Sequence, residues 1–182
     1  MRVLGIDPGS INTGYGVVEK GGAGKLLHIA DGTISAGADM PLPERLLKIS
    51  EGLKEVFNEF KPEAVAIESL FFSKNVRSAI MLGHARGVAL LSAASNGLEV
   101  FEYAPRAVKQ AVVGYGAATK DQVQKMVKAL LKTPAVSKAD AADALAIAIC
   151  HIHHGPKGTL KYSAADYKEL VKAASKPVKP SI

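Results

Sequence analysis

Two short apolar segments of the chain end in a carboxylate, at a place where a buried strand would be expected to offer Val or Ile. Residues 3–6 are followed by Asp7, and residues 64–67 are followed by Glu68. Carboxylates next to such segments are costly to desolvate unless a cation or a proton compensates their charge. The chain must therefore fold so that both carboxylates are compensated.

A third apolar segment, residues 139–149, contains two more acids in a pattern typical of a helix. Asp140 and Asp143 are three residues apart, so on a helix they project from one face with Cβ atoms roughly 5–6 Å apart. Alanines and branched apolar residues around them leave few positions for an exposed face. Together the two carboxylates could ligate a hard cation.

The four acids are candidates for one metal site. Asp7 and Glu68 would lie at the carboxyl ends of strands, the edge of an α/β sheet where ligands usually bind. On neighbouring strands they would be about 5 Å apart. Mg²⁺ prefers oxygen ligands, and two such ions roughly 3.5–4 Å apart can activate a water and stabilise the leaving oxygen of a phosphodiester. Spacing alone also allows a simpler interpretation, in which the strand-end acids form turns or helix caps and the helical pair faces solvent.

Charge is unevenly distributed along the 182 residues, whose net charge is +6. Residues 1–69 carry seven Lys and Arg and ten Asp and Glu, whereas residues 70–132 carry nine and three. Residues 155–182 carry six Lys and two acids. Basic segments of this kind favour nucleic-acid binding, because phosphate contacts release condensed counterions. A solvated basic face without a partner would give the same charge pattern.

Length and composition favour one cytoplasmic domain. A chain of this length with 48% apolar residues can bury one substantial core. It has no apolar stretch long enough to span a membrane and no signal-peptide pattern, so we expect a cytoplasmic protein. A single cysteine, Cys150, excludes an internal disulfide and is expected in the core.

Apolar periodicity and turn residues predict an α/β fold. We expect a mixed five-stranded sheet with helices on both faces, in which the first three strands form an antiparallel meander. The expected strands are residues 2–7, 15–19, 26–35, 65–68 and 100–103, and the expected helices are residues 42–60, 75–95, 105–112, 119–132 and 137–154. Residues 1–154 are predicted to form one domain, and residues 155–182 a basic, partly disordered C-terminal tail.

Several short segments, spread in order through residues 1–154, match one family pattern. They are residues 4–10 (LGIDPGS), 13–16 (TGYG), 66–68 (AIE), 83–89 (GHARGVA), 101–104 (FEYA), 108–110 (VKQ), 112–114 (VVG) and 139–148 (ADAADALAIA). Together these segments resemble the motifs of the RuvC-type Holliday junction resolvases, which have the ribonuclease H fold. The resemblance implies a homodimeric endonuclease that nicks two strands of a four-way DNA junction symmetrically in recombination and repair.

The resemblance also implies a set of site residues. Asp7, Glu68, Asp140 and Asp143 would be both the catalytic residues and the ligands of Mg²⁺, with two ions per active site and Mn²⁺ as a substitute. A branch-migration motor is the further partner that the family implies. Two other hypotheses remain: a non-catalytic module that binds branched DNA, and a ribonuclease H-like nuclease with another substrate.

Five residues are expected to bind DNA. Lys109 and Lys120 match basic positions that the family uses near the scissile phosphate. Phe71 matches an aromatic that stacks on junction bases, although a Phe beside two apolar residues could equally belong to the core. Lys74 and Arg77 complete the set in the basic middle segment.

Two other patterns, three histidines and a pair of glycines, do not indicate metal ligands. The histidines 151, 153 and 154 are too far along the predicted helix to share the metal of Asp143, since His151 would be roughly 12 Å away. We interpret them as cations that interact with the dipole at the helix C-terminus. Gly83 and Gly87, four residues apart on the long helix, allow close approach of either a dimer mate or the chain's own sheet, and we favour the dimer.

Overall fold

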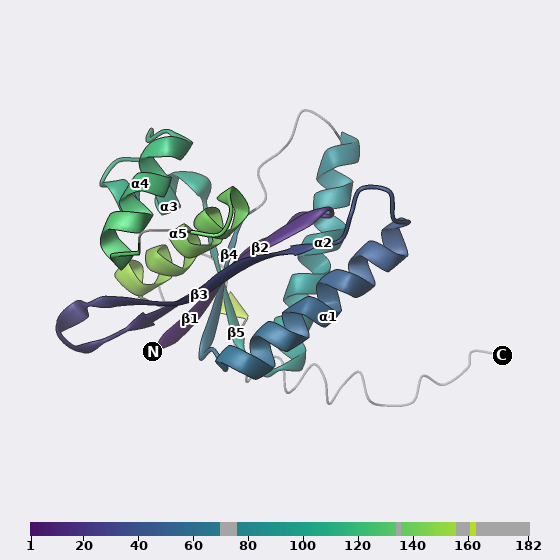
Figure 1. The fold of residues 1–182 in the computed structure, drawn as a ribbon, viewed down its shortest axis with the longest axis horizontal. Coiled ribbons are helices and arrows are strands. Elements are labelled where there is room, and N and C mark those ends of the chain that lie inside the picture. The colour runs from purple at the N-terminus through teal and green to yellow at the C-terminus, as the bar shows by residue number, and fades with distance from the viewer. Residues whose placement is uncertain (70–75, 134–135, 156–160, 163–182) are drawn as a thin grey trace.

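The computed structural model describes residues 1–69, 76–133, 136–155 and 161–162, which form a mixed sheet between two layers of helices (Figure 1). The order of the sheet is β3-β2-β1-β4-β5-β6. Strands β1 to β3 are antiparallel neighbours, β1, β4 and β5 run parallel, and β6 is antiparallel to β5. The strands are β1 (Arg2–Asp7), β2 (Asn12–Lys20), β3 (Leu26–Ser35), β4 (Ala64–Glu68), β5 (Glu99–Tyr103) and β6 (Lys161–Tyr162).

The five predicted strands are therefore confirmed, including the meander of the first three. The prediction missed β6, a two-residue strand from the segment expected to be a tail, which extends the sheet beside β5. A two-residue strand has no recognisable sequence pattern, because only its pairing with β5 makes it a strand. The remaining tail residues, 156–160 and 163–182, lie outside the described residues, so the expected disorder stays a prediction.

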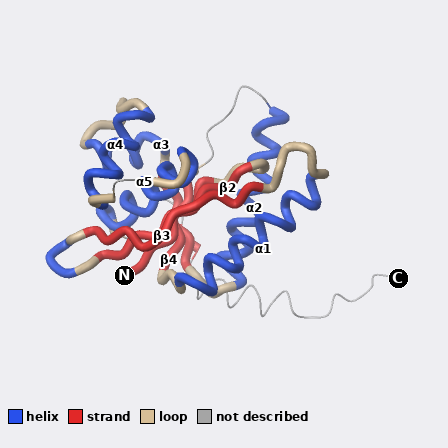
Figure 2. The backbone as a smooth tube through the Cα atoms, in the orientation of Figure 1, coloured by secondary structure: helices blue, strands red, loops and turns tan. Residues whose placement is uncertain are grey.

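Helices cover both faces of the sheet, as expected. In Figures 1 and 2, α1 and α2 lie on one side and α3, α4 and α5 on the other. The helices are α1 (Leu42–Phe60), α2 (Val76–Ser95), α3 (Pro105–Val113), α4 (Lys120–Leu131) and α5 (Ala139–His154), and a 3-10 turn, η1 (Gly22–Gly24), connects β2 to β3. None of the described helices combines the length and apolarity needed to cross a membrane.

Alternation along the central strands builds a core on each side of the sheet. Successive strand residues point to opposite faces. Leu4 and Ile6 of β1 pack with α1 and α2, whereas Val3 packs with α3, α4 and α5. In β4 the same alternation sends Val65 and Ile67 to the first core and its alanines to the second. A strand buried on both faces therefore has a continuous apolar sequence.

The buried helix α5 lies directly on the backbone of β1 and β2. A Cβ atom added at Gly5 would overlap the carbonyl oxygen of Ala144, and one added at Gly14 would overlap the carbonyl oxygen of Asp140. These glycines are needed for close approach rather than for a turn. They place the first two turns of α5 against the strands that carry the predicted site.

The start of α5 differs from the prediction. We expected the helix from Ser137, but it begins at Ala139. Lys138 has an extended backbone, with φ −153° and ψ 169°, and the backbone N–H of Ser137 donates to Asp31 Oδ2 of β3 at 2.8 Å. This long-range hydrogen bond holds Ser137 outside the helix, and local sequence does not reveal it.

The interpretation of the histidines as a group of cations is wrong for His151. Its side chain is buried, with 1% exposure, and its Nδ1 lies 2.7 Å from the Tyr103 hydroxyl. Burial lowers the pKa of His151 to about 4, so the ring is neutral near neutral pH. His153 and His154 are exposed, and for them the interpretation stays a prediction. Cys150 is buried and unpaired, as expected.

Candidate active site

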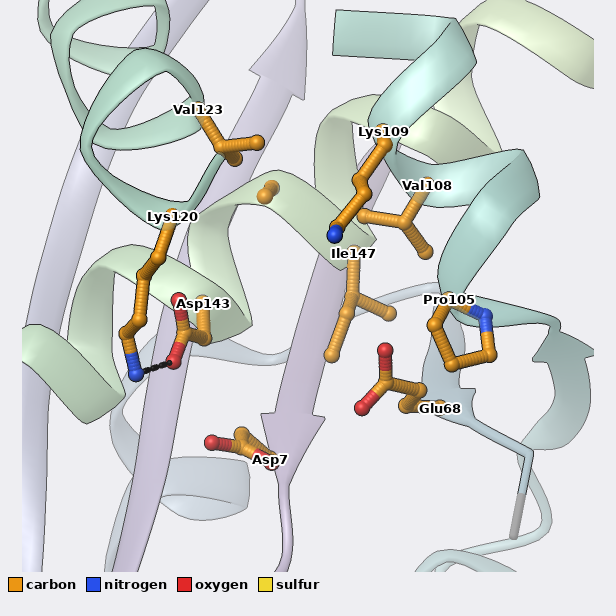
Figure 3. A pocket seen from close by; sticks show the side chains of 10 residues that line it. Asp7, Glu68, Pro105, Val108, Lys109, Lys120, Val123, Asp143 and Ile147 are labelled. Carbon is orange, nitrogen blue, oxygen red and sulfur yellow. Dashed lines mark ion pairs between the residues drawn. The ribbon is translucent and has the colours of Figure 1, made fainter. Parts of the chain in front are cut away.

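Three elements bring the four predicted acids to one edge of the sheet. Asp7 ends β1 and Glu68 ends β4, and because these neighbouring strands are parallel, their carboxyl ends meet at the same edge. In Figure 3 both carboxylates face the cavity below Asp143, which extends from α5. Asp140 lies one helical turn earlier on α5, above Gly14, which pairs with Asp7 across β1 and β2.

Three of the carboxylates form a compact group. Asp7, Asp140 and Asp143 each offer one oxygen, and these oxygens lie within 4.8 Å of one another. All three side chains are partly buried. A set of carboxylate oxygens with one open side fits a hard divalent cation such as Mg²⁺ or Mn²⁺.

Glu68 lies across the cavity from this group. It is not part of the compact set of oxygens, but together with Asp7 and Asp143 it lines a cavity with a volume of about 230 Å³ (Figure 3). The structure therefore brings three predicted acids within reach of one ion and places the fourth on the opposite wall. Such an arrangement leaves room for a substrate oxygen between the two sides.

Electrostatics show that the acids lack full compensation. The pKa of Asp7 is raised to about 7, first by burial and then by the charges of Asp143, Glu68 and Asp140. The pKa of Glu68 is also raised, mainly by burial and by Asp143, while Lys109 and Lys120 oppose the shift. Clustered carboxylates that raise one another's pKa favour binding of a cation that relieves the repulsion.

Two predicted lysines lie at the site. Lys120 Nζ is 2.6 Å from Asp143 Oδ2, and this hydrogen bond raises the pKa of the lysine (Figure 3). Lys120 is the first residue of α4, where Thr119 caps the helix by accepting a hydrogen bond from the backbone of Gln122. Lys109 of α3 lines the same cavity. The cap thus fixes the position of a cation beside the acids.

The other three predicted DNA-binding residues are not part of this cavity. Arg77 is exposed in the first turn of α2 and does not line the cavity. Phe71 and Lys74 lie outside the described residues. Their proposed contacts with DNA stay predictions.

Sequence reasoning missed the apolar wall of the cavity. One side of it is built from residues of α3, α4 and α5, namely Pro105, Val108, Val123, Ala146 and Ile147 (Figure 3). The periodicity of these helices marks the valines and Ile147 as core residues, but nothing local shows that they border the acids. Because this wall is apolar, a bound molecule can form polar contacts only on the side of the cavity that the carboxylates and lysines line.

The raised pKa of Asp7 predicts the effect of neutralising it in the metal-free protein. Ionising a carboxyl whose pKa rises from 3.8 to about 7 on folding destabilises the folded state. This cost is absent at low pH, grows as pH rises between the two values, and is complete above the higher one. Asp7→Asn should therefore raise the free energy of unfolding by about 1–3 kcal/mol near pH 8 and change it little near pH 4.

Urea unfolding in the presence of a chelator, at several pH values, measures this effect. Asp121→Asn is the matched control, because Asp121 is exposed on α4 and pairs with Lys125 on the surface. The control should change stability by less than about 0.5 kcal/mol at every pH. A clear loss of stability in Asp7→Asn near pH 8 would instead make the Asp7 carboxylate a structural element.

Comparisons with known proteins agree with this geometry. The family model described as crossover junction endodeoxyribonuclease RuvC matches residues 3–151. The crossover junction endodeoxyribonuclease RuvC of Trichlorobacter lovleyi is 55% identical over 153 residues, which cover 84% of this chain and 85% of that protein. The protein of the same name from Syntrophotalea carbinolica is 53% identical over 153 residues, covering 84% and 94%.

Solved structures show the same fold. The structure of T. thermophilus RuvC in complex with Holliday junction substrate matches with a TM-score of 0.79 and 39% identity, covering 85% of this chain and 94% of that one. The yeast mitochondrial Holliday junction resolvase Ydc2 matches with a TM-score of 0.56 at 14% identity, a likeness of fold alone. The predicted ribonuclease H-like fold class is confirmed.

Proposed function

Because the chain belongs to the RuvC family of crossover junction endodeoxyribonucleases, we propose that it resolves four-way DNA junctions by metal-dependent hydrolysis of phosphodiester bonds. The observation that carries this proposal is the group of three carboxylates within 4.8 Å, with Glu68 on the opposite wall of the same cavity. Symmetric nicking of two strands in recombination and repair follows from the family. Residues 1–154 would form the nuclease domain.

Asp7, Asp140 and Asp143 would hold the metal, with Glu68 as the ligand from the facing wall. Bound Mg²⁺ or Mn²⁺, in our proposal two ions, would supply an activated water and stabilise the leaving oxygen. The protein's own contribution is to hold four acids at one sheet edge, where burial keeps the pKa values of Asp7 and Glu68 raised until cations bind. The apolar wall limits the positions that water can occupy.

The lysines of the site would contact the DNA backbone. Lys109 and Lys120 offer positive charge beside the acids, so a phosphate entering the cavity would meet cations on the side facing α3 and α4. Arg77, Phe71 and Lys74 would also bind the junction. We also propose cooperation with a branch-migration motor in the cytoplasm.

A cleavage assay with a labelled four-way junction tests the proposed function. In Mg²⁺ we expect paired nicks at symmetric positions near the crossover, and no nicks in a chelator. A linear duplex and an RNA–DNA hybrid of the same sequence serve as substrate controls. A mobility shift of the junction without nicks in any metal would point to a binding module, and preferential cutting of the hybrid to a different nuclease.

The proposed function requires two sites related by a two-fold axis, so we propose a homodimer. Support comes from the outer face of α2, where exposed apolar residues and glycines recur at helical spacing and form a stripe. Val76, Ile80 and Leu91 are exposed there at 71%, 55% and 64%. Between them a Cβ added at Gly83 or Gly87 would meet none of the described atoms within 4 Å. An apolar stripe with a flat centre suits a second copy of the same helix.

Leu91→Glu should weaken this dimer, because it places a charge within the apolar stripe. We expect the dissociation constant to rise at least about tenfold, which corresponds to 1.4 kcal/mol. Analytical ultracentrifugation over a concentration series measures it. Leu47→Glu is the matched control, since Leu47 is exposed at 59% but lies on α1, outside the stripe. If Leu91→Glu and the control dimerise alike, the interface lies elsewhere.

A further inference from the structure

A buried arginine of α2 contacts the end of the strand that carries Glu68. Arg86 is 7% exposed and lies on the buried face of α2, which also carries Ala85, Ala89 and Ala93. Its Nη1 donates a hydrogen bond to the backbone carbonyl of Glu68 at 2.8 Å, and its Nη2 forms an ion pair with Oε1 of Glu102 on β5. The planar guanidinium can serve both partners at once, which the single ammonium of a lysine cannot do with the same geometry.

The carbonyl that Arg86 contacts lies where the strand stops. The parallel register between β1 and β4 ends at the pair Ile6 and Ile67, one residue before Glu68. On the other side Glu68 still pairs with Tyr103 of β5, and the N–H of Ser69 donates to the Tyr103 carbonyl at 2.9 Å. Arg86 therefore adds a side-chain contact at the residue where pairing with β1 has ended.

The ion pair with Glu102 explains why Arg86 can be buried there. An arginine and a glutamate removed from water are each costly, and the pairing compensates both. Buried ion pairs add little net stability compared with apolar residues of similar size, so they are often retained for another reason. The hydrogen bond to Glu68 supplies such a reason.

We propose that Arg86 is a positioning residue for Glu68, an inference that rests on the proposed function. By fixing the backbone at residue 68, it directs the Glu68 carboxylate across the cavity toward Asp7 and Asp143. Arg86 sits on the helix whose outer face carries the proposed dimer stripe. It thereby links that helix to the wall of the active site that faces the carboxylate group.

The test must separate positioning from folding. Arg86→Met alone leaves Glu102 buried with its ion-pair partner removed, so the variant could lose stability for that reason. The double variant Arg86→Met with Glu102→Gln removes that charge and still lacks the donor to the Glu68 carbonyl. Glu102→Gln alone is the matched control, because it keeps the Arg86 guanidinium that donates to the Glu68 carbonyl. Thermal unfolding identifies a temperature at which every variant is folded.

Two measurements follow at that temperature. The first is the Mg²⁺ concentration that gives half-maximal junction cleavage, together with the maximal rate. The second is Mn²⁺ binding to the protein without DNA, from the electron paramagnetic resonance signal of free Mn²⁺. Loss of a group that orients a ligand typically costs about 10–100-fold in metal affinity or activity. We expect losses in this range for the double variant and less than about threefold for Glu102→Gln.

Arg86→Lys should lie between the double variant and the wild type, because a lysine can keep one of the two contacts. A double variant that is folded, binds Mn²⁺ and cleaves like the wild type would overturn the role of Arg86. That result is distinguishable from failure of the proposed function, in which the wild-type protein itself would not cleave the junction.

Discussion

Asp7→Asn should reduce junction cleavage by at least about a thousandfold, a loss of roughly 4 kcal/mol in transition-state stabilisation. Asp7 belongs to the compact group of oxygens and lines the cavity shared with Glu68, as Asp143 does, and the charges of all three other acids raise its pKa. An amide cannot replace the charge of a carboxylate ligand. Glu68→Gln, Asp140→Asn and Asp143→Asn should also abolish cleavage under the proposed function.

Junction binding should survive the Asp7→Asn substitution. Removal of a negative charge near the proposed DNA path does not weaken phosphate contacts, so we expect affinity to stay within about threefold at fixed salt. Single-turnover cleavage and a mobility-shift titration, both on the same labelled junction, measure the two properties. The control is again Asp121→Asn, whose exposed carboxylate on α4 pairs with Lys125 and does not line the cavity.

A cleavage rate within about tenfold of wild type in Asp7→Asn would contradict the proposed metal site. Loss of binding together with cleavage would point to a different role, in which Asp7 shapes the DNA-binding surface. The apo stability measured for the same variant helps to separate these cases. If Asp7 is a metal ligand, Asp7→Asn should stabilise the metal-free protein. If the Asp7 carboxylate is structural, the same substitution should destabilise it.

Gly14→Ala should damage both stability and the active site through a single methyl group. The added Cβ would overlap the carbonyl oxygen of Asp140, so α5 must move away from β2 or the strand must bend. Overpacking of this kind costs about 1–3 kcal/mol, and the contact with backbone puts the expectation at the upper end. The same shift displaces Asp140, so we expect Mn²⁺ affinity to fall at least about tenfold.

Chemical unfolding and Mn²⁺ titration measure the two effects. The matched control is Gly22→Ala in the connection between β2 and β3, where an added Cβ would meet none of the described atoms within 4 Å. It should leave both properties close to wild type. If Gly14→Ala lowers stability but binds Mn²⁺ normally, the position of Asp140 does not depend on this close approach.

Much of the fold could be predicted because its signals are local. Pro43 in the first turn of α1 and the Thr119 capping box of α4 mark helix starts that the structure confirms. The continuous apolar run of β4 is typical of a strand buried on both faces, and β4 lies between two cores. Such features depend on residues within one or two turns or on the alternation along a single strand.

The errors in the prediction share one cause. Ser137 is kept out of α5 by Asp31, more than one hundred residues earlier in the chain, and His151 loses its charge through burial beside Tyr103. The strand β6 exists through its pairing with β5. Each of these three features depends on a partner that is distant in sequence, and no local sequence pattern identifies that partner.

The sequence by itself determined the helices, five of the strands and the identity of four acids whose apolar surroundings demand compensation. Only the tertiary structure decided that three of them form a compact group, that Glu68 faces them across a cavity, and that Arg86 contacts the Glu68 backbone. The reason is physical: periodicity depends on neighbours along the chain, whereas the charge state and the partners of a side chain depend on distances and burial that exist only after folding.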